Sequence, residues 1–363
     1  MSDPQPNVLL LADRFEARGS SAYTLRLAEH LPEEGIVAQV ASSDARLVPA
    51  WRRDLLTIAE YRHLSTPVWG RVVLASLCQD LSEDIPDLVH VQSRSMLACG
   101  RLLASRLKRP LVLTVHDYLS PHETLRFDGR RDRRIIAVSE SVRDELQEQT
   151  VLWSERFSVI HSGVELQSEV DAPPLFDPNR VPVVGTAGPL EASKGLPFFL
   201  QAAKQVLAGK HDAEFLVAGA GPEEIALRRL SRELGIGEKV TFSPGVTEFS
   251  TSLEAMDIFC LPSLKQGLGT IMLEAMAYGR PVIASGVGGV YSVVRDQDTN
   301  LVVPPSDSEA LAERIIELLD DPIRARAIGV AGRQVVQERF GVQQMVRETA
   351  RLYRDVLENE LSR

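Results

Sequence analysis

Residues 257–286 read DIFCLPSLKQGLGTIMLEAMAYGRPVIASG, and this stretch decides the fold. The apolar runs 257–263 and 281–286 have the length of buried strands, and 270–278 between them has the composition of a helix. Strand, helix and strand in this order predict two parallel strands joined by a helical crossover. The glycine-rich loop follows the first strand, at the edge of the sheet where proteins of this class bind ligands.

One carboxylate, Glu274, interrupts the apolar helix that follows this loop. An acid among apolar side chains requires a partner or a ligand. The small residues 267–269 let a ligand approach the backbone, and a helix that starts at Thr270 favours negative charge at its N-terminus. A carboxylate one turn further can accept hydrogen bonds from two neighbouring hydroxyls, as on a ribose. The alternative is a structural glutamate held in a salt bridge.

Short apolar runs alternate with amphipathic ones along the rest of the chain, which is typical of parallel sheets covered by helices. The expected strands are 7–12, 36–41, 87–92, 110–115, 134–139, 157–162, 181–187, 213–219, 239–245, 257–263, 281–286 and 300–305. The expected helices are 21–31, 95–107, 140–149, 195–208, 222–235, 270–278, 308–319, 322–339 and 342–360.

This alternation predicts two doubly wound, Rossmann-like α/β domains that face each other across a cleft. The first is expected over 1–168 and the second over 183–340. Between them, 169–182 is polar and rich in proline, as linkers are. A C-terminal helix in 341–363 is expected to pack back on the first domain.

Composition excludes several classes of protein. The net charge of -10 is opposite to what a general nucleic-acid binder requires. The polar start MSDPQPN does not resemble a signal peptide, and the apolar runs are too short to span a bilayer. The three cysteines have no metal or redox spacing, so they are expected to be thiols of a cytoplasmic protein, with the inner face of the membrane as one place of action.

Two further turns could hold an anion. Gly19 lies with two serines at a helix start, where it could mark a phosphate site or a simple N-cap. Lys194 precedes another helix, where it could hold a diphosphate or remain a solvated loop lysine.

The stretch LPSLKQGLGTIMLEAMAYGRPVIAS (261–285) resembles the donor-site signature of retaining GT-B glycosyltransferases of family 4. AVSESVRDEL (137–146), VIHSGVE (159–165) and KVTFSPGV (239–246) are similar to other segments of that family. The resemblance implies a hexosyltransferase-type enzyme, which transfers a sugar from a nucleoside diphosphate sugar to an acceptor hydroxyl. It also implies retention of the anomeric configuration and no need for a metal ion.

By the same resemblance, each candidate site residue has an expected role. Glu274 binds the ribose of the donor, and His116 faces the transferred sugar. The diphosphate is surrounded by Gly19, Lys194, Gly267, Leu268, Gly269 and Thr270. The expected donor is a UDP- or GDP-sugar with no other cofactor, and the acceptor is a carbohydrate, a lipid-linked molecule or a small molecule.

Three positions depart from the family pattern. Gln266 replaces a glutamate that contacts the donor sugar, Pro189 an arginine and Ser162 an asparagine. Two rival functions therefore stay open: a non-catalytic sugar-nucleotide-binding or scaffold protein, and a sugar-nucleotide epimerase.

The DQD triplet at 296–298 resembles a metal-binding pattern, but a solvated turn is the simpler interpretation. The arginine-rich stretch 126–134 could attract an anionic lipid surface or a phosphorylated acceptor, but a solvated loop is the preferred interpretation.

Overall fold

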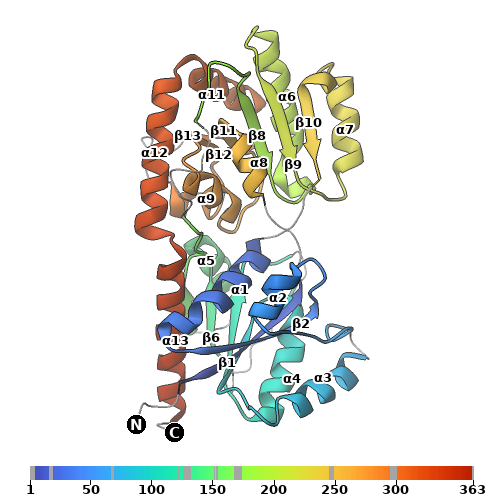
Figure 1. Ribbon diagram of the computed structural model, residues 1–363, viewed down its shortest axis with the longest axis vertical. Helices are drawn as coiled ribbons and strands as arrows, with labels where there is room; N and C mark the ends of the chain where they lie inside the picture. The colour runs from blue at the N-terminus through green and yellow to red at the C-terminus, as the bar shows by residue number, and fades with distance from the viewer. Residues whose placement is uncertain are drawn as a thin grey trace. The chain divides into compact units, whose positions relative to one another are not determined.

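A computed structural model describes residues 5–15, 19–66, 69–120, 123–125, 132–150, 152, 154–166, 174–244, 249–294 and 301–361. Its contacts divide the chain into two compact units (Figure 1). The N-terminal unit comprises Met1–Gly163 together with Val342–Arg363, and the C-terminal unit comprises Val164–Gly341.

The N-terminal unit is built on a seven-stranded sheet with the order β3-β2-β1-β4-β5-β6-β7, in which every pairing is parallel. The strands are β1 (Asn7–Arg14), β2 (Val37–Asp44), β3 (Ile58–Glu60), β4 (Leu88–Val91), β5 (Leu111–Val115), β6 (Asp132–Ala137) and β7 (Phe157–Val159). The helices are α1 (Gly19–His30), α2 (Ala50–Leu55), α3 (Trp69–Asp80), α4 (Leu97–Leu107), α5 (Glu140–Gln149) and α13 (Val342–Leu361).

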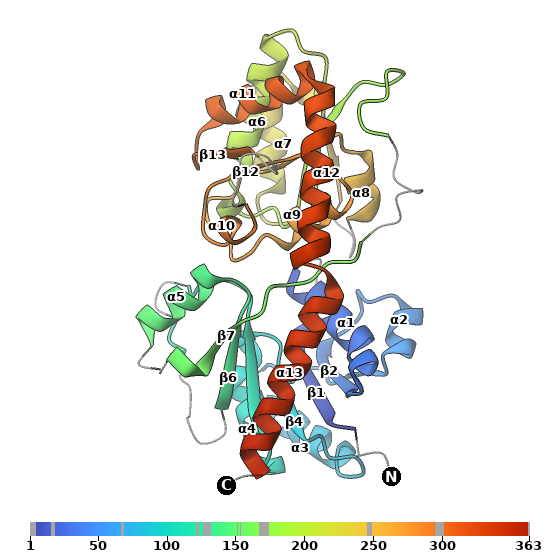
Figure 2. The same cartoon turned by 90° about the vertical axis from the view of Figure 1, so that its left-hand side faces the viewer.

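Helices bury both faces of this sheet, which explains why its strands are continuous apolar runs. Val8 and Leu10 of β1 share a core with α1 and α13. Leu11 points to the other face, where a Cβ on Gly100 of α4 would lie only 3.4 Å from its Cδ2 atom. Figure 2 shows α13 lying across the strands of this unit.

Helix α13 packs on the sheet and is also hydrogen-bonded to one of its central strands. Tyr353 is fully buried, and its hydroxyl lies 2.5 Å from Nδ1 of His90 on β4. The other ring nitrogen of His90 lies 2.7 Å from Oγ1 of Thr114 on β5. Burial lowers the pKa of His90 to about 3, so this histidine is a neutral part of the core.

The C-terminal unit has a six-stranded parallel sheet with the order β10-β9-β8-β11-β12-β13. The strands are β8 (Val183–Ala187), β9 (Glu214–Ala218), β10 (Val240–Ser243), β11 (Ile258–Leu261), β12 (Val282–Ser285) and β13 (Leu301–Val303). The helices are α6 (Leu196–Ala208), α7 (Glu224–Glu233), α8 (Ser250–Ala255), α9 (Thr270–Ala277), α10 (Val290–Val293), α11 (Ser308–Asp320) and α12 (Pro322–Arg339).

Local sequence signals set where several of these helices begin. The Asp307 carboxylate accepts hydrogen bonds from the amides of Glu309 and Ala310 and so caps α11. Asp321 does the same for α12, where it accepts from the Arg324 amide at 3.0 Å and is followed by a proline at the first helical position. Ser139 caps α5 through the amide of Val142.

One buried carboxylate fastens the start of the C-terminal unit to its sheet. Asp257, fully buried just before β11, accepts hydrogen bonds from the backbone amides of Phe176 at 2.6 Å and Val183 at 2.8 Å. Both of its oxygens also bind the guanidinium of Arg180, at 2.6 and 2.7 Å. Four donors therefore converge on one side chain, which ties residues 176–183 to the centre of the sheet.

The chain passes between the units twice, and the two crossings are bonded to each other. The amide of Val164 donates to the carbonyl oxygen of Phe340 at 2.9 Å, and Val164 forms a parallel bridge with Gly341. The first crossing therefore runs beside the second, which leads into α13.

The predicted fold of two doubly wound parallel α/β units is confirmed, and each unit has a point where its strand order reverses. In the N-terminal unit this point lies between β1 and β4, and in the C-terminal unit between β8 and β11. Loops beyond the carboxyl ends of such strands are where these sheets bind ligands.

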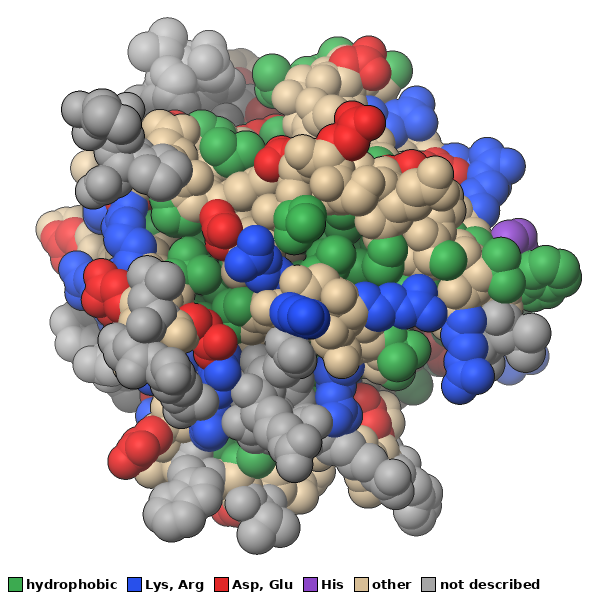
Figure 3. Space-filling model, turned by 90° about the horizontal axis from the view of Figure 1, so that it is seen from below, with side chains coloured by type: hydrophobic (Ala, Val, Ile, Leu, Met, Phe, Trp, Pro, Cys, Tyr) green, Lys and Arg blue, Asp and Glu red, His purple; other side chains and the backbone are tan. Residues whose placement is uncertain are grey.

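Within the described residues, no helix combines the length and apolar character needed to cross a bilayer. Figure 3 shows one face of the molecule on which Lys and Arg side chains lie among apolar side chains. Most of the arginine-rich stretch 126–134 and the DQD triplet at 296–298 lie outside the described residues.

Candidate active site

The loops after β8 and β11 meet at the reversal point of the C-terminal sheet. Gly195 makes this approach possible, because a Cβ there would lie 2.0 Å from the carbonyl oxygen of Pro262. Its φ of 63° is also in the left-handed region that glycine adopts at low cost. The amide of Leu264 donates to the carbonyl oxygen of Ser193 at 2.8 Å and holds the two loops together. Lys194, at the end of the short 3-10 turn Ala192–Lys194, is thereby placed beside the end of β11.

The side chains of Lys194 and Gln266 are in direct contact. The Lys194 ammonium donates to Oε1 of Gln266 at 3.2 Å, and the buried Ser263 hydroxyl donates to the same oxygen at 3.1 Å. The backbone oxygen of Gln266 accepts from the amide of Gly289 at 3.0 Å. The glutamine is therefore fixed at both ends, and it orients the lysine without neutralising its charge.

Helix α9 begins immediately beyond this cluster. Gly269 is its N-cap, with φ 93°, and its carbonyl oxygen accepts from the amides of Met272 and Leu273. The amides at the start of a helix have no carbonyl partner within the helix, so those of Thr270 and Ile271 are suited to an anion. Lys194, Gln266 and the 267–270 loop therefore present positive charge and N–H groups in one place.

Glu274 lies one turn inside α9. Its neighbours Leu273, Ala275 and Met276 are buried, whereas Glu274 itself is half-buried. The helix thus packs its apolar residues against the unit and brings this carboxylate to the surface. Lys194 lies in the segment that connects β8 to β9. Gln266, the 267–270 loop and Glu274 lie in the segment that connects β11 to β12. Both segments start at the reversal point of the C-terminal sheet.

His116 lies at the carboxyl end of β5 in the N-terminal unit, next to the reversal point between β1 and β4. The ring of Tyr23 on α1 meets it edge-on, with the ring centroids 4.9 Å apart. A hydrogen bond links His116 to the backbone of Gln92, yet burial lowers its pKa to about 4. The imidazole is therefore neutral at pH 7.

The second ring nitrogen of His116, Nε2, is buried and has no hydrogen-bond partner within the described parts of the chain. Such an atom in a polar position calls for a ligand or water. Gly19 opens α1 on the same edge of the sheet, directly after residues 16–18, which lie outside the described ranges. His116 and Gly19 therefore belong to the N-terminal unit, and the other predicted residues to the C-terminal unit.

Sequence reasoning missed some members of these clusters. Ser263 lies in the quoted LPS segment, but only the structure shows that its hydroxyl binds Gln266. Gln92 and Tyr23, which position His116, carried no signal because a polar residue after a strand and an aromatic residue in a helix are common. Asp257 was treated simply as the first residue of a strand.

Two doubly wound α/β units define the GT-B class of glycosyltransferase folds. In this chain, the loops at the reversal point of the second unit contain small residues and a lysine. Residues 17–168 match the family described as Glycosyltransferase Family 4, and residues 181–321 match that described as Glycosyl transferases group 1. The chain therefore belongs to family 4 of the glycosyltransferases.

Among curated proteins, the chain is 36% identical over 197 residues to a Corynebacterium glutamicum enzyme, the GDP-mannose-dependent monoacylated alpha-(1-6)-phosphatidylinositol monomannoside mannosyltransferase. This match covers 50% of the chain and 51% of that protein, so the chain spans about half the length of the relative. It is 26% identical over 318 residues to the 2-deoxystreptamine glucosyltransferase of Streptomyces kanamyceticus, which covers 84% of the chain and 78% of that enzyme.

Solved structures resemble the fold over nearly the whole chain. An Anabaena protein, HepE, in complex with UDP and glucose superimposes with a TM-score of 0.80 at 20% identity, covering 96% of the chain and 100% of that protein. The sucrose-phosphate synthase of Thermosynechococcus elongatus gives a TM-score of 0.76 at 21% identity, covering 98% and 100%. At these identities the likeness shows the fold.

Proposed function

We propose that this protein transfers a hexose from a nucleoside diphosphate sugar to an acceptor hydroxyl, with retention of the anomeric configuration and without a metal ion. The observation that carries the proposal is the contact between Lys194 and Gln266 beside the N-terminus of α9. An ammonium group and a helix N-terminus together suit a diphosphate, whose charge increases as it leaves the sugar.

Each side chain then has one role. Lys194 and the amides of the 267–270 loop bind the diphosphate, and Glu274 binds the ribose. In the N-terminal unit, the neutral His116 uses its buried Nε2 atom to bind a hydroxyl of the transferred sugar, and Gly19 lies against the diphosphate. A UDP- or GDP-sugar is the proposed donor, because a solved structure of the same fold holds UDP and a relative is named for GDP-mannose.

The acceptor is proposed to be a carbohydrate, a lipid-linked molecule or a small molecule, since one relative is named for a phosphatidylinositol monomannoside and another for 2-deoxystreptamine. Peripheral contact with a membrane stays a prediction.

The proposal is tested first at Lys194. Because Lys194 acts through charge, Lys194→Met is expected to weaken binding of UDP or GDP by about 10- to 100-fold, the size expected for a lost bond to a charged group. Binding of the bare nucleoside should change by less than about 2-fold. Calorimetric titration measures both, and Lys204→Met on the exposed side of α6 is the matched control. Equal losses for nucleotide and nucleoside would contradict the assignment.

A second candidate function is a protein that binds sugar nucleotides without catalysis, and the uncharged Gln266 and Pro189 favour it. Gln266→Glu separates the two. A carboxylate 3.2 Å from the Lys194 ammonium would pair with it and draw its charge away from the diphosphate. A transferase adapted to Gln266 should therefore lose turnover, measured as sugar transfer or donor hydrolysis over a panel of UDP- and GDP-sugars. Increased transfer in the variant would instead show a site that has lost catalytic charge.

A further inference from the structure

A polar cavity of about 330 Å³ lies at the carboxyl edge of the N-terminal sheet, beyond the ends of β1, β2 and β3. This volume is within the range of small-molecule sites. Every residue lining it is polar or charged: Arg14, Ser43, Asp44, Arg46, Glu60, Arg62, His63, Ser65 and Thr66. A ligand rich in hydroxyls finds both hydrogen-bond donors and acceptors here.

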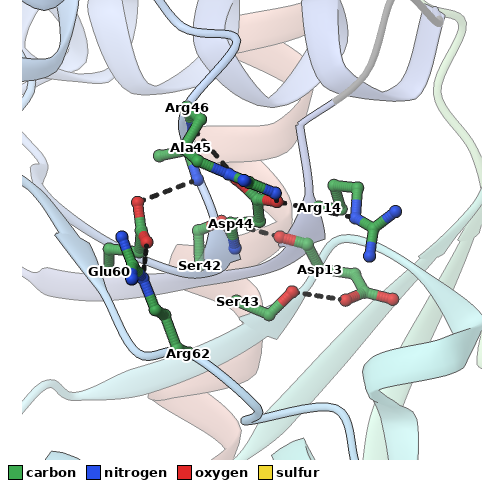
Figure 4. A network of polar contacts seen from close by, with 9 residues as sticks. All are labelled: Asp13, Arg14, Ser42, Ser43, Asp44, Ala45, Arg46, Glu60 and Arg62. Atoms are coloured by element: carbon green, nitrogen blue, oxygen red, sulfur yellow. Dashed lines mark hydrogen bonds and ion pairs between the residues drawn. The ribbon is translucent and has the colours of Figure 1, made fainter.

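Figure 4 shows the charged side chains in pairs, and the carboxylates are less exposed than the arginines. The side chains of Asp44 and Glu60 are only 15% and 21% exposed. Arg46 binds Asp44 through two bonds, of 3.0 and 2.6 Å, and Arg62 binds Glu60 at 2.9 Å. Nε of Arg14 lies 3.7 Å from Oδ2 of Asp44. These three arginine side chains are 63–75% exposed and form the rim.

The lining holds three arginines and two carboxylates, and a third carboxylate, Asp13, accepts a hydrogen bond from Ser43 of the cavity wall. Hydrogen bonds from Arg46 hold the pKa of Asp44 well below its usual range, and those from Arg62 lower the pKa of Glu60. Both carboxylates therefore stay ionised and can accept hydrogen bonds from hydroxyls. A guanidinium has five N–H donors, so an exposed arginine bound to one carboxylate keeps donors for an anion.

The rim is held by the fold. Leu64, in the loop after β3, is 1% exposed and anchors that loop. His63 beside it has φ 68°, a conformation that costs energy for a residue other than glycine. Ion pairs this exposed contribute little to stability. Folding stability alone therefore does not account for a strained, anchored loop that presents paired charges to a cavity.

The cavity is linked to the edge of the sheet where His116 lies. Asp13, near the end of β1, accepts from the hydroxyl of Ser43 in the cavity wall at 2.6 Å. Its other oxygen accepts from the Ser95 hydroxyl at 2.7 Å, just beyond β4. Gln92, which binds His116, also follows β4. Asp13 thus links the cavity wall to the segment that follows β4, and Gln92 belongs to the same segment.

We infer that this cavity binds the acceptor, and that the acceptor is a sugar or other polyol carrying a single phosphate or carboxylate group. Asp44 and Glu60 accept from its hydroxyls, and the rim arginines bind its anionic group. The inference rests on the proposed function, since it assigns the second substrate of the same transfer.

The test is calorimetric titration of the whole 363-residue chain with four probes: glucose, glucose 6-phosphate, glucuronate and inorganic phosphate. Glucose 6-phosphate, glucuronate or both should bind at least about 10-fold more tightly than glucose. Whichever anionic probe binds more tightly identifies the anionic group. Inorganic phosphate should bind more weakly than glucose 6-phosphate, because it lacks the hydroxyls.

Two cavity variants and one control complete the design. Arg46→Gln should weaken the anionic probes by about 5- to 10-fold and leave glucose unchanged. Glu60→Gln should weaken glucose 6-phosphate more than inorganic phosphate. Arg229→Gln is the matched control, because Arg229 is 72% exposed and paired with Glu233 but lies in the C-terminal unit. This variant should leave the affinity for every probe unchanged.

The inference is wrong if glucose binds as tightly as its anionic counterparts, if no probe binds, or if Arg46→Gln and Arg229→Gln behave alike. Inorganic phosphate binding as tightly as glucose 6-phosphate would show a simple anion site and also overturn it. UDP and GDP titrations of the wild-type protein and the same variants keep the two proposals apart. If the wild-type protein binds UDP or GDP but none of the four probes, only the cavity assignment is rejected. If the wild-type protein binds no nucleotide, the proposed function is rejected.

Discussion

Glu274→Ala is expected to weaken the binding of UDP or GDP by about 10- to 150-fold while leaving the fold intact. If Glu274 accepts hydrogen bonds from the ribose, the loss is about 1.5–3 kcal/mol, the usual contribution of bonds to a charged group. The fold should survive because the carboxylate is half-buried, while the apolar residues around it on α9 keep their packing. Titration of the nucleotide, together with the melting temperature, measures both effects.

Glu317→Ala is the matched control for this experiment. Glu317 is also a half-buried glutamate on a helix of the C-terminal unit, but it binds Arg314 at 2.6 Å on α11, outside both crossovers of the site. Its removal should leave nucleotide affinity unchanged. If the folded Glu274→Ala protein keeps wild-type affinity, the carboxylate does not contact the donor and the site has been assigned wrongly.

Asp257→Ala should have the largest effect on stability. It leaves Arg180 without its carboxylate and removes the acceptor for the amides of Phe176 and Val183. Breaking a buried, hydrogen-bonded ion pair from one side costs about 3–5 kcal/mol. For a domain of about 150–250 residues, this lowers the melting temperature by roughly 6–20 °C.

Calorimetry should show this loss in the transition of the C-terminal unit. Asp212→Ala offers the comparison, because Asp212 pairs with Lys239 at 3.0 Å but is 71% exposed. Exposed pairs contribute little, so this control should melt close to the wild type. Similar melting temperatures for the two variants would mean that Asp257 does not fasten residues 176–183 to the sheet.

The fold could be predicted from the sequence because both sheets are buried on both faces. Each of the twelve expected strands is present, with ends that differ by a few residues, since apolar runs between polar turns carry a strong signal. The strand β3 was missed because it has only three residues and lies at the sheet edge. Short helices such as α2 and α10 were missed because four to six residues show little periodicity. The 12-residue helix α3 was missed as well.

The candidate site could be predicted only residue by residue. The quoted stretch indicated Gln266 and Glu274, and the glycine-rich turn indicated Lys194. The contact between Lys194 and Gln266 joins positions 72 residues apart. It depends on the close approach of Gly195 to Pro262, which no local sequence pattern reveals. The acceptor cavity was not predicted at all, because its charged residues come from the ends of three strands and the segments after them, and each resembles ordinary solvated surface.

The place of α13 has a consequence for how this protein is made. Residues 342–361 leave the ribosome after the whole of the C-terminal unit, yet Met345, Val346 and Tyr353 belong to the core of the N-terminal unit. Domains generally fold in the order of their synthesis. Here we expect the reverse order, because the N-terminal sheet lacks part of its core until a helix translated some 180 residues later is available. In nascent chains whose synthesis is arrested before α13, the amides of β11 should therefore be protected from hydrogen exchange while those of β1 still exchange.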